Sequence, residues 1–252
     1  MNSPADDPLA PLVALPGVAE AADAARSALA TVHRHPANRR GWPTTAAESV
    51  LRGARASAGV EGASVRLDAD SETDEVLAGA LRVAGELTGE SLDRAVGVWT
   101  RSPLQELAHL HLLAASGPGV APASLGRPRS DAGVAERLQG LAELVTGGTR
   151  VPAPVLAAVV LGELSGLRPF GSADGIVARA AFRLVVVSTG LDPHCLGVPE
   201  VTFYRDPQAH REALEGFVGG TEDGVATWIL HCCSALENGA REATSIADAA
   251  GA

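Results

Sequence analysis

The chain has 252 residues, of which 46% are hydrophobic and only 3% aromatic, so a sizeable core must be filled mainly by Leu, Val and Ala. Small side chains let helices approach one another closely, and this composition favours packed helices. The formal net charge of −10 argues against a general nucleic-acid binder or a binder of anionic membranes, because both need a basic surface.

The cysteines and the apolar runs bear on the cellular compartment. Cys232 and Cys233 are adjacent and Cys195 stands alone, so no disulfide framework is predicted. The N-terminus, MNSPADDPL, is acidic where a signal peptide would be basic. The longest apolar run, residues 151–162, is too short to span a bilayer and contains two prolines. We therefore expect a soluble cytoplasmic protein with no membrane association.

The first part of the chain contains one clear helical pattern between two segments without one. Residues 1–16 are rich in Pro and Asp and are expected to form a flexible N-terminus. Ala-rich spacing without a breaker predicts a helix over residues 18–33. Residues 35–45 contain two prolines and are expected to form a connecting loop.

A second helix is predicted directly after this loop. Thr45 is expected to cap it, with Glu48 three residues later completing a capping box. The helix is expected to end near Glu61, and residues 62–72 are polar and turn-like.

Apolar spacing predicts helices through most of the remaining chain. The predicted ranges are 72–88, 90–98, 103–115, 131–146, 153–165, 207–218 and 221–243. Ser102 is expected to cap the third of these, with Pro103 at its first position, and residues 115–131 form a Gly/Pro loop. Residues 185–188 (VVVS) could form a strand, but they continue an apolar helix without a break. The fold is predicted to be all-α, without an internal repeat.

One turn has the composition of an anion site. Residues 171–175 (GSADG) precede an apolar helix that is expected to end at Gly190, a usual left-handed cap position. Free backbone N–H groups and the helix dipole make such a turn a possible phosphate cradle. Arg179 and Arg183 lie on the same face of the helix and could reach the same anion.

A simpler interpretation of this turn stays open. Ser172 or Asp174 could merely cap a buried helix, and capped helices are far commoner than anion sites.

The same stretch resembles the core motif of Fic (Fido-fold) proteins, HPFx[D/E]GNGRxxR. In that family the motif catalyses transfer of AMP from ATP to a protein hydroxyl. Residues 168–179 read RPFGSADGIVAR and keep Pro169, Phe170, Gly175 and Arg179.

The resemblance also implies that most of the chemical groups are replaced. Arg168 stands in place of the general-base histidine, and a guanidinium that stays protonated cannot accept a proton. Ser172 replaces the metal-binding acid, although Mg²⁺ prefers a carboxylate. Asp174 adds negative charge beside the cradle, Ile176 removes one of two phosphate arginines, and Ala173 replaces the first glycine. Together these changes argue against ordinary AMP transfer.

A second motif lies on the expected side of the first. ARASAGVEGAS contains Ser57 and Glu61 four residues apart, on one helix face, and resembles the [S/T]xxxE[G/N] inhibitory motif of Fic proteins. The resemblance implies that Glu61 pairs with Arg179. Such a pair could gate the site, or it could be plain architecture, because removing one partner would leave a buried charge unpaired.

Three weaker segments extend the resemblance over about residues 45–243. They are LAHLHLLAA (107–115), LGRPR (125–129) and FYRDPQAHREALEGF (203–217). In Fic enzymes a β-hairpin flap follows the second segment and docks the target peptide. Here RPRSD runs directly into a predicted helix, so this device is expected to be shortened or missing.

The resemblance implies a Fido-like helical bundle over residues 69–252, with an N-terminal helical extension over 17–68. We expect a degenerate Fic-fold pseudoenzyme that lacks standard AMPylation and binds a protein partner, or keeps a weak site for ATP or ADP with Mg²⁺. That site would contain Gly171, Ser172, Gly175, Arg179 and Arg183. The alternative is an active Fido-type nucleotidyl- or phosphotransferase in which Arg168 and Asp174 are catalytic.

A structural role in a homo-oligomer is a third hypothesis, and a large apolar patch on the surface would support it.

No metal site is predicted elsewhere. His109 and His111 lie two residues apart on a helix and face different directions, and His231, Cys232 and Cys233 are adjacent helical residues.

Overall fold

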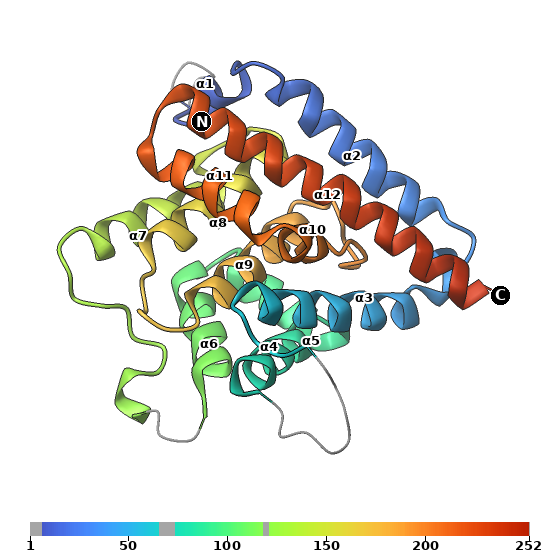
Figure 1. Cartoon of the computed structure of the whole chain (residues 1–252), viewed down its shortest axis with the longest axis horizontal. Coiled ribbons are helices and arrows are strands. Elements are labelled where there is room, and N and C mark those ends of the chain that lie inside the picture. Colours follow the sequence, from blue (N-terminus) through green and yellow to red (C-terminus); the bar gives the residue numbers. More distant parts are fainter. Residues whose placement is uncertain (1–6, 66–73, 118–120, 252) are drawn as a thin grey trace.

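The computed structural model describes residues 7–65, 74–117 and 121–251, and this part of the chain is helical with no strand (Figure 1). The all-α prediction is therefore confirmed. The helices are α1 (Ala10–Val13), α2 (Val18–Arg34), α3 (Asn38–Val60), α4 (Glu75–Glu86), α5 (Gly89–Trp99), α6 (Pro103–Ala115), α7 (Val134–Glu143), α8 (Ala153–Leu167), α9 (Asp174–Ser188), α10 (Glu200–Arg205), α11 (Pro207–Gly219) and α12 (Glu222–Gly251). Two short turns of helix complete the list: η2 (Pro122–Ser124) lies between α6 and α7 in the sequence, and η3 (Leu144–Gly148) directly follows α7.

Helix α9 forms the centre of the molecule. Its residues are buried on nearly every side from Ile176 to Val186, which is typical of a helix surrounded by other helices. α8 packs along it after the connecting turn, and α3, α5 and α6 contact its other sides (Figure 1). The N-terminus of α9 therefore lies where several helices meet.

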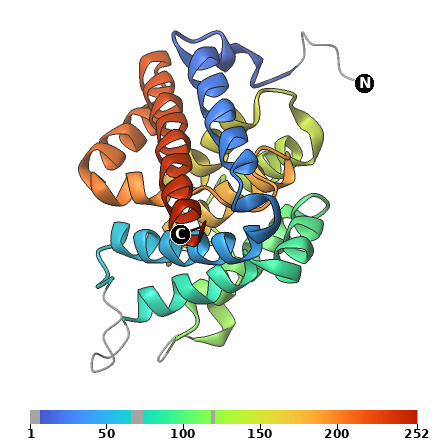
Figure 2. The ribbon, with the colours of Figure 1, turned by 90° about the vertical axis from the view of Figure 1, so that its right-hand side faces the viewer.

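The longest helix, α12, has 30 residues and is about 45 Å long. α2 packs along it, and α3 runs across the lower ends of both (Figure 2). One hydrophobic cluster joins residues of α2 and α3 to those of α8, α9 and α12. The predicted domain boundary at residues 68 and 69 lies outside the described residues. No described helix is both long enough and apolar enough to cross a membrane.

The predicted loop over residues 35–45 is mostly helical, because α3 begins at Asn38 and contains Pro43. The Asn38 side chain donates to the Val32 carbonyl (2.9 Å) and accepts from the Thr45 hydroxyl (2.7 Å). These bonds hold the first turns of α3 despite the backbone bond that Pro43 cannot make. The prediction that Thr45 caps a new helix is therefore wrong.

Three smaller predictions also differ from the structure. α1 lies within residues 1–16, where no regular structure was expected, and Asp7 ties this segment to the Thr149 hydroxyl (2.7 Å). Ser102 is the N-cap residue of α6 and Pro103 its first residue, as predicted, but the Ser102 side chain makes no capping bond. Helix α10 was not predicted, because its six residues are too few to show a helical period.

Candidate functional site

The turn between α8 and α9 has an unusual backbone that Arg129 holds in place. Arg168 (φ 49°) and Ala173 (φ 52°) both lie in the left-handed region, which is unfavourable for residues other than glycine. The Arg129 guanidinium donates to the carbonyls of Arg168 (2.9 Å) and Leu167 (3.0 Å), and its amide donates to the Pro169 carbonyl (2.7 Å). Arg129 thus satisfies carbonyls at the end of α8 that have no partner within the helix.

His111 on α6 holds the other side of the turn. Its Nδ1 accepts a bond from the Gly126 amide (2.9 Å), so Nε2 carries the proton and donates to the Ser172 hydroxyl (3.1 Å). The ring stacks on Phe170 with centroids 4.2 Å apart. Burial lowers the pKa of His111, which favours the neutral ring that this arrangement needs. Only the LAHLHLLAA segment could have indicated this role from the sequence.

Asp174 points into the protein rather than toward a ligand. Its carboxylate accepts from the Phe170 amide (2.8 Å), and its other oxygen has no hydrogen-bond partner among the described residues. Burial raises the pKa of Asp174, against the opposing effect of the Phe170 and Gly171 amides. The residue before α9 is Ala173, and no side chain caps the helix. The capping interpretation for Ser172 and Asp174 is therefore wrong, and Asp174 closes the turn instead.

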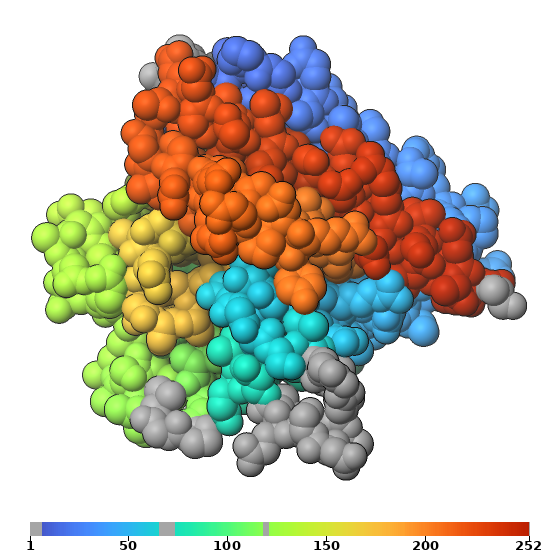
Figure 3. Space-filling model, viewed as in Figure 1, coloured from blue at the N-terminus to red at the C-terminus, as the bar shows by residue number. Residues whose placement is uncertain are grey.

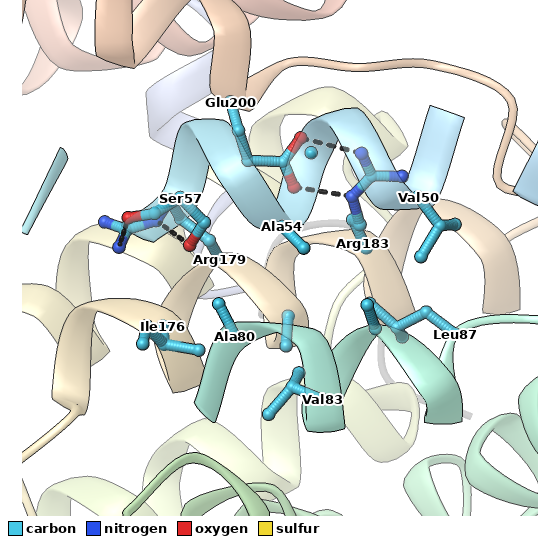
Figure 4. A pocket seen from close by; sticks show the side chains of 13 residues that line it. Val50, Ala54, Ser57, Ala80, Val83, Leu87, Ile176, Arg179, Arg183 and Glu200 are labelled. Atoms are coloured by element: carbon cyan, nitrogen blue, oxygen red, sulfur yellow. Dashed lines mark hydrogen bonds and ion pairs between the residues drawn. The ribbon is translucent and has the colours of Figure 1, made fainter. Parts of the chain in front are cut away.

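Arg179 contacts Ser57 and Glu61, so the predicted contact between the two motifs is present. The guanidinium donates to the Ser57 hydroxyl (2.7 Å), to the Ser57 carbonyl (2.9 Å) and to Glu61 Oε1 (2.8 Å). The Arg179 side chain is 4% exposed, whereas that of Glu61 is 34% exposed. Figure 4 shows Ser57 on α3 pointing at Arg179 on α9. These charge-assisted bonds join the end of α3 to α9.

Glu61 also covers the N-terminus of α9. A Cβ atom on Gly175 would lie 2.1 Å from Glu61 Oε1, so the carboxylate rests against the first turn of the helix and a side chain at position 175 would collide with it. A negative charge is favourable at a helix N-terminus. Figure 3 shows the end of α3 lying against the turn that precedes α9. The Glu61 carboxylate thus lies beside the turn at which the sequence predicts an anion site.

Arg183 lies one helical turn deeper and has other partners. It donates to both carboxylate oxygens of Glu200 on α10 (2.5 and 2.7 Å) and contacts Cys195 Sγ (3.1 Å). Both side chains of the ion pair are at most 5% exposed. Burial raises the pKa of Cys195 to about 11, so the thiol is neutral. The proposed phosphate role of Arg183 finds no support in this arrangement, because Glu200 occupies its guanidinium.

The space between the two arginines is nearly filled. The cavity there has a volume of about 20 Å³, which is room for about one water molecule. Its apolar wall includes Ile176 and residues of α3 and α4 (Figure 4). Arg168 is exposed and lies outside this cavity. Ser172, bound to His111, offers no carboxylate to Mg²⁺. The residues present do not fit a magnesium-bound nucleotide in this arrangement.

Comparison with known proteins adds no further constraint. No family model matches the chain, and no curated protein matches it. In the described residues, no group of three or more His, Cys, Asp or Glu side chains is placed to hold a metal ion. The Fic resemblance therefore stays a prediction that rests on the motif residues.

Proposed function

We propose that the chain is a degenerate Fic-like protein, a cytoplasmic pseudoenzyme that does not transfer AMP and acts by binding a partner protein. In this proposal a residual nucleotide or phosphate site at the start of α9 is kept closed by Glu61. The observation that carries the proposal is the position of the Glu61 carboxylate, which lies against Gly175 and binds Arg179.

The position of Arg168 supports the loss of catalysis. Its guanidinium stays protonated at any working pH and cannot take a proton from an attacking hydroxyl. It also stands at the end of α8, where Arg129 holds its carbonyl. Asp174 does not stand in for it, because its carboxylate is turned toward the Phe170 amide.

The segment before α7 supports the loss of target docking. Residues 125–133 lead from η2 to α7 and contain no strand. An added peptide strand needs an exposed strand edge to pair with. A partner would therefore have to bind by side-chain contacts rather than by strand addition.

A transfer assay tests this proposal. Wild type and Glu61→Ala are incubated with Mg²⁺ and ATP carrying a label on the α-phosphate, together with a cell lysate. Labelled protein is counted, and the mass of the chain itself is measured. The matched control is Glu48→Ala, which removes a half-exposed glutamate, paired with Arg52, from the same helix.

The proposal predicts that none of the three proteins labels the lysate or gains the mass of one AMP. Labelling by Glu61→Ala and not by Glu48→Ala would overturn it. That result would favour the alternative, an active Fido-type nucleotidyl- or phosphotransferase whose site Glu61 closes.

A further inference from the structure

A larger cleft lies at the opposite end of α9 from the turn described above. It has a volume of about 510 Å³ and is formed by α2, by the start of α8 and by the loop that follows α9. The 15 residues of α9 place it about 20 Å from the Glu61 contact. This volume lies in the range of sites for small molecules.

One wall of the cleft is held by a buried carboxylate. Asp192 is 3% exposed and accepts bonds from the amides of Leu196 (2.9 Å) and Gly197 (2.7 Å) and from His33 Nε2 (2.8 Å). Burial opposes its ionisation, but the bonds from His33 and the two amides still leave the pKa of Asp192 below its ordinary value. The loop is thus folded around an ionised side chain, and the cleft is formed before any ligand arrives.

His33 joins this wall to α2 and lines the cleft. Since ionised Asp192 can only accept, Nε2 of His33 is the donor of their bond. The nitrogen that remains for a ligand is Nδ1. On its other side, the loop is supported by His194, whose ring stacks on Trp42 with centroids 4.0 Å apart.

The lining combines an apolar floor with a cationic rim. Pro152, Pro154 and Leu191 contribute to the floor, and Arg26 and Arg34 stand on α2. Arg34 donates to the Thr31 hydroxyl, and among the described residues no carboxylate lies within 4.0 Å of it. Within the part of the chain that the structure describes, the one carboxylate paired with Arg26 is that of Asp23, and both side chains are more than 65% exposed. Such a pair is worth little and exchanges easily with another anion.

We propose that this cleft binds a small organic anion, with an apolar body on the proline-rich floor and a carboxylate or sulfonate group at Arg34, and with Arg26 adding positive charge farther along α2. A chain with a net charge of −10 repels anions in general, so a negative ligand is attracted only where cations such as Arg34 and Arg26 line a cleft. The proposal does not depend on the Fic resemblance.

A second cleft of similar size provides an internal comparison. It has a volume of about 620 Å³ and lies between the N-terminal segment, α7 and α8. Its arginine, Arg137, donates twice to Glu163 (3.1 and 2.7 Å), and Glu143 also lines it. The Arg137 charge is neutralised by Glu163, so this cleft lacks an arginine that is free to bind an anion.

The test uses a fluorescent probe and its uncharged analogue, 8-anilinonaphthalene-1-sulfonate and N-phenyl-1-naphthylamine. Both are titrated into wild type, Ala30→Trp, Arg34→Ala and Arg137→Ala. The first variant fills the proposed cleft, the second removes its cation, and the third is the matched arginine in the comparison cleft. Near-ultraviolet circular dichroism shows that each protein is folded.

The proposal predicts that the sulfonate binds wild type and Arg137→Ala equally, with one site. Binding weakens about tenfold in Ala30→Trp and several-fold in Arg34→Ala, and the uncharged analogue binds wild type about tenfold less tightly than the sulfonate. Absence of sulfonate binding to wild type would overturn the proposal. So would equal binding of the two probes, or binding that Arg137→Ala weakens and Ala30→Trp does not.

Discussion

At the scale of single residues, the ion pair between Arg183 and Glu200 is the least exposed among the described residues. Replacing Glu200 by Gln would leave the Arg183 charge buried without a counter-charge. We expect Glu200→Gln to lower the free energy of unfolding by about 3–5 kcal/mol, measured by urea denaturation.

The control for this prediction is Glu48→Gln, which breaks a pair whose side chains are 39% and 43% exposed and should cost less than about 1 kcal/mol. The double variant Arg183→Met/Glu200→Leu should recover most of the loss, because apolar side chains of similar volume replace both charges. Equal losses in Glu200→Gln and Glu48→Gln would show that the buried pair contributes nothing special.

A second residue-level prediction concerns pH. His210 is buried and stacks on Phe203. A hydrogen bond joins its Nδ1 to Nε2 of His231 (3.1 Å). Burial, with added repulsion from Arg179 and His231, lowers the pKa of His210 to about 3. The unfolded chain takes up a proton near pH 6.5 and the folded chain does not, so stability should fall as pH drops from about 6.5 toward 3, by up to about 1.4 kcal/mol per unit.

Urea unfolding at several pH values across this window measures the slope. His210→Gln should make the slope shallower, because the group that titrates only in the unfolded state is gone. His109→Gln, a change at a 45% exposed side chain, should leave it unchanged. Identical slopes in wild type and His210→Gln would contradict the assignment.

The sequence predicts part of the candidate site. Contacts between side chains that lie far apart along the chain are the hardest to predict. Glu61 and Arg179 are 118 residues apart, and only the order of two family-like motifs suggested that they meet. No pattern pointed to Glu200 as the partner of Arg183, because a lone glutamate in a six-residue helix carries no signal. Only the family-like segment LAHLHLLAA could have indicated the bond between His111 and Ser172, since a histidine on an apolar face is most often a core residue.

At the scale of secondary-structure elements, hydrogen bonds of the Asn38 side chain stabilise the first turns of α3. Asn38 joins the end of α2 to Thr45 across Pro43. We expect Asn38→Ala to cost about 1–2 kcal/mol and to increase hydrogen exchange of the amides in residues 38–46 while leaving the rest of α3 protected. Unchanged exchange there would mean that the proline-containing turns are stable without Asn38.

Most helices could be predicted because their apolar residues repeat over three or more turns. Residues 103–115 were predicted with the observed bounds of α6, and Gly190 has the left-handed conformation (φ 75°) expected after α9. Residues 185–188 proved helical rather than extended. The missed helical segments lie where a proline suggested a break that the Asn38 side chain bridges, and where a helix has only four or six residues, as in α1 and α10.

At the scale of the whole molecule, α3 contacts neighbouring helices at several positions along its length. Arg52 pairs with Glu242 on α12 (2.8 Å), and the Tyr204 ring lies so close to Gly59 that a Cβ there would come within 2.3 Å of it. The helix also shares the hydrophobic cluster of α9 and α12. Uncovering the start of α9 therefore requires a change at the partly exposed Glu61 side chain, since moving α3 as a body would break the core.

Closure of a phosphate site by Glu61 is tested most directly by calorimetry. ADP with Mg²⁺ is titrated into wild type, Glu61→Ala and Glu48→Ala, and each protein is shown to be folded. If Glu61 closes a phosphate site, wild type and Glu48→Ala give no binding heat, and Glu61→Ala binds weakly because Arg179 and the first turn of α9 lose their internal carboxylate. Equal binding in wild type and Glu61→Ala would contradict closure of this site by Glu61. Absence of heat in folded Glu61→Ala would contradict the existence of a residual phosphate site beneath it.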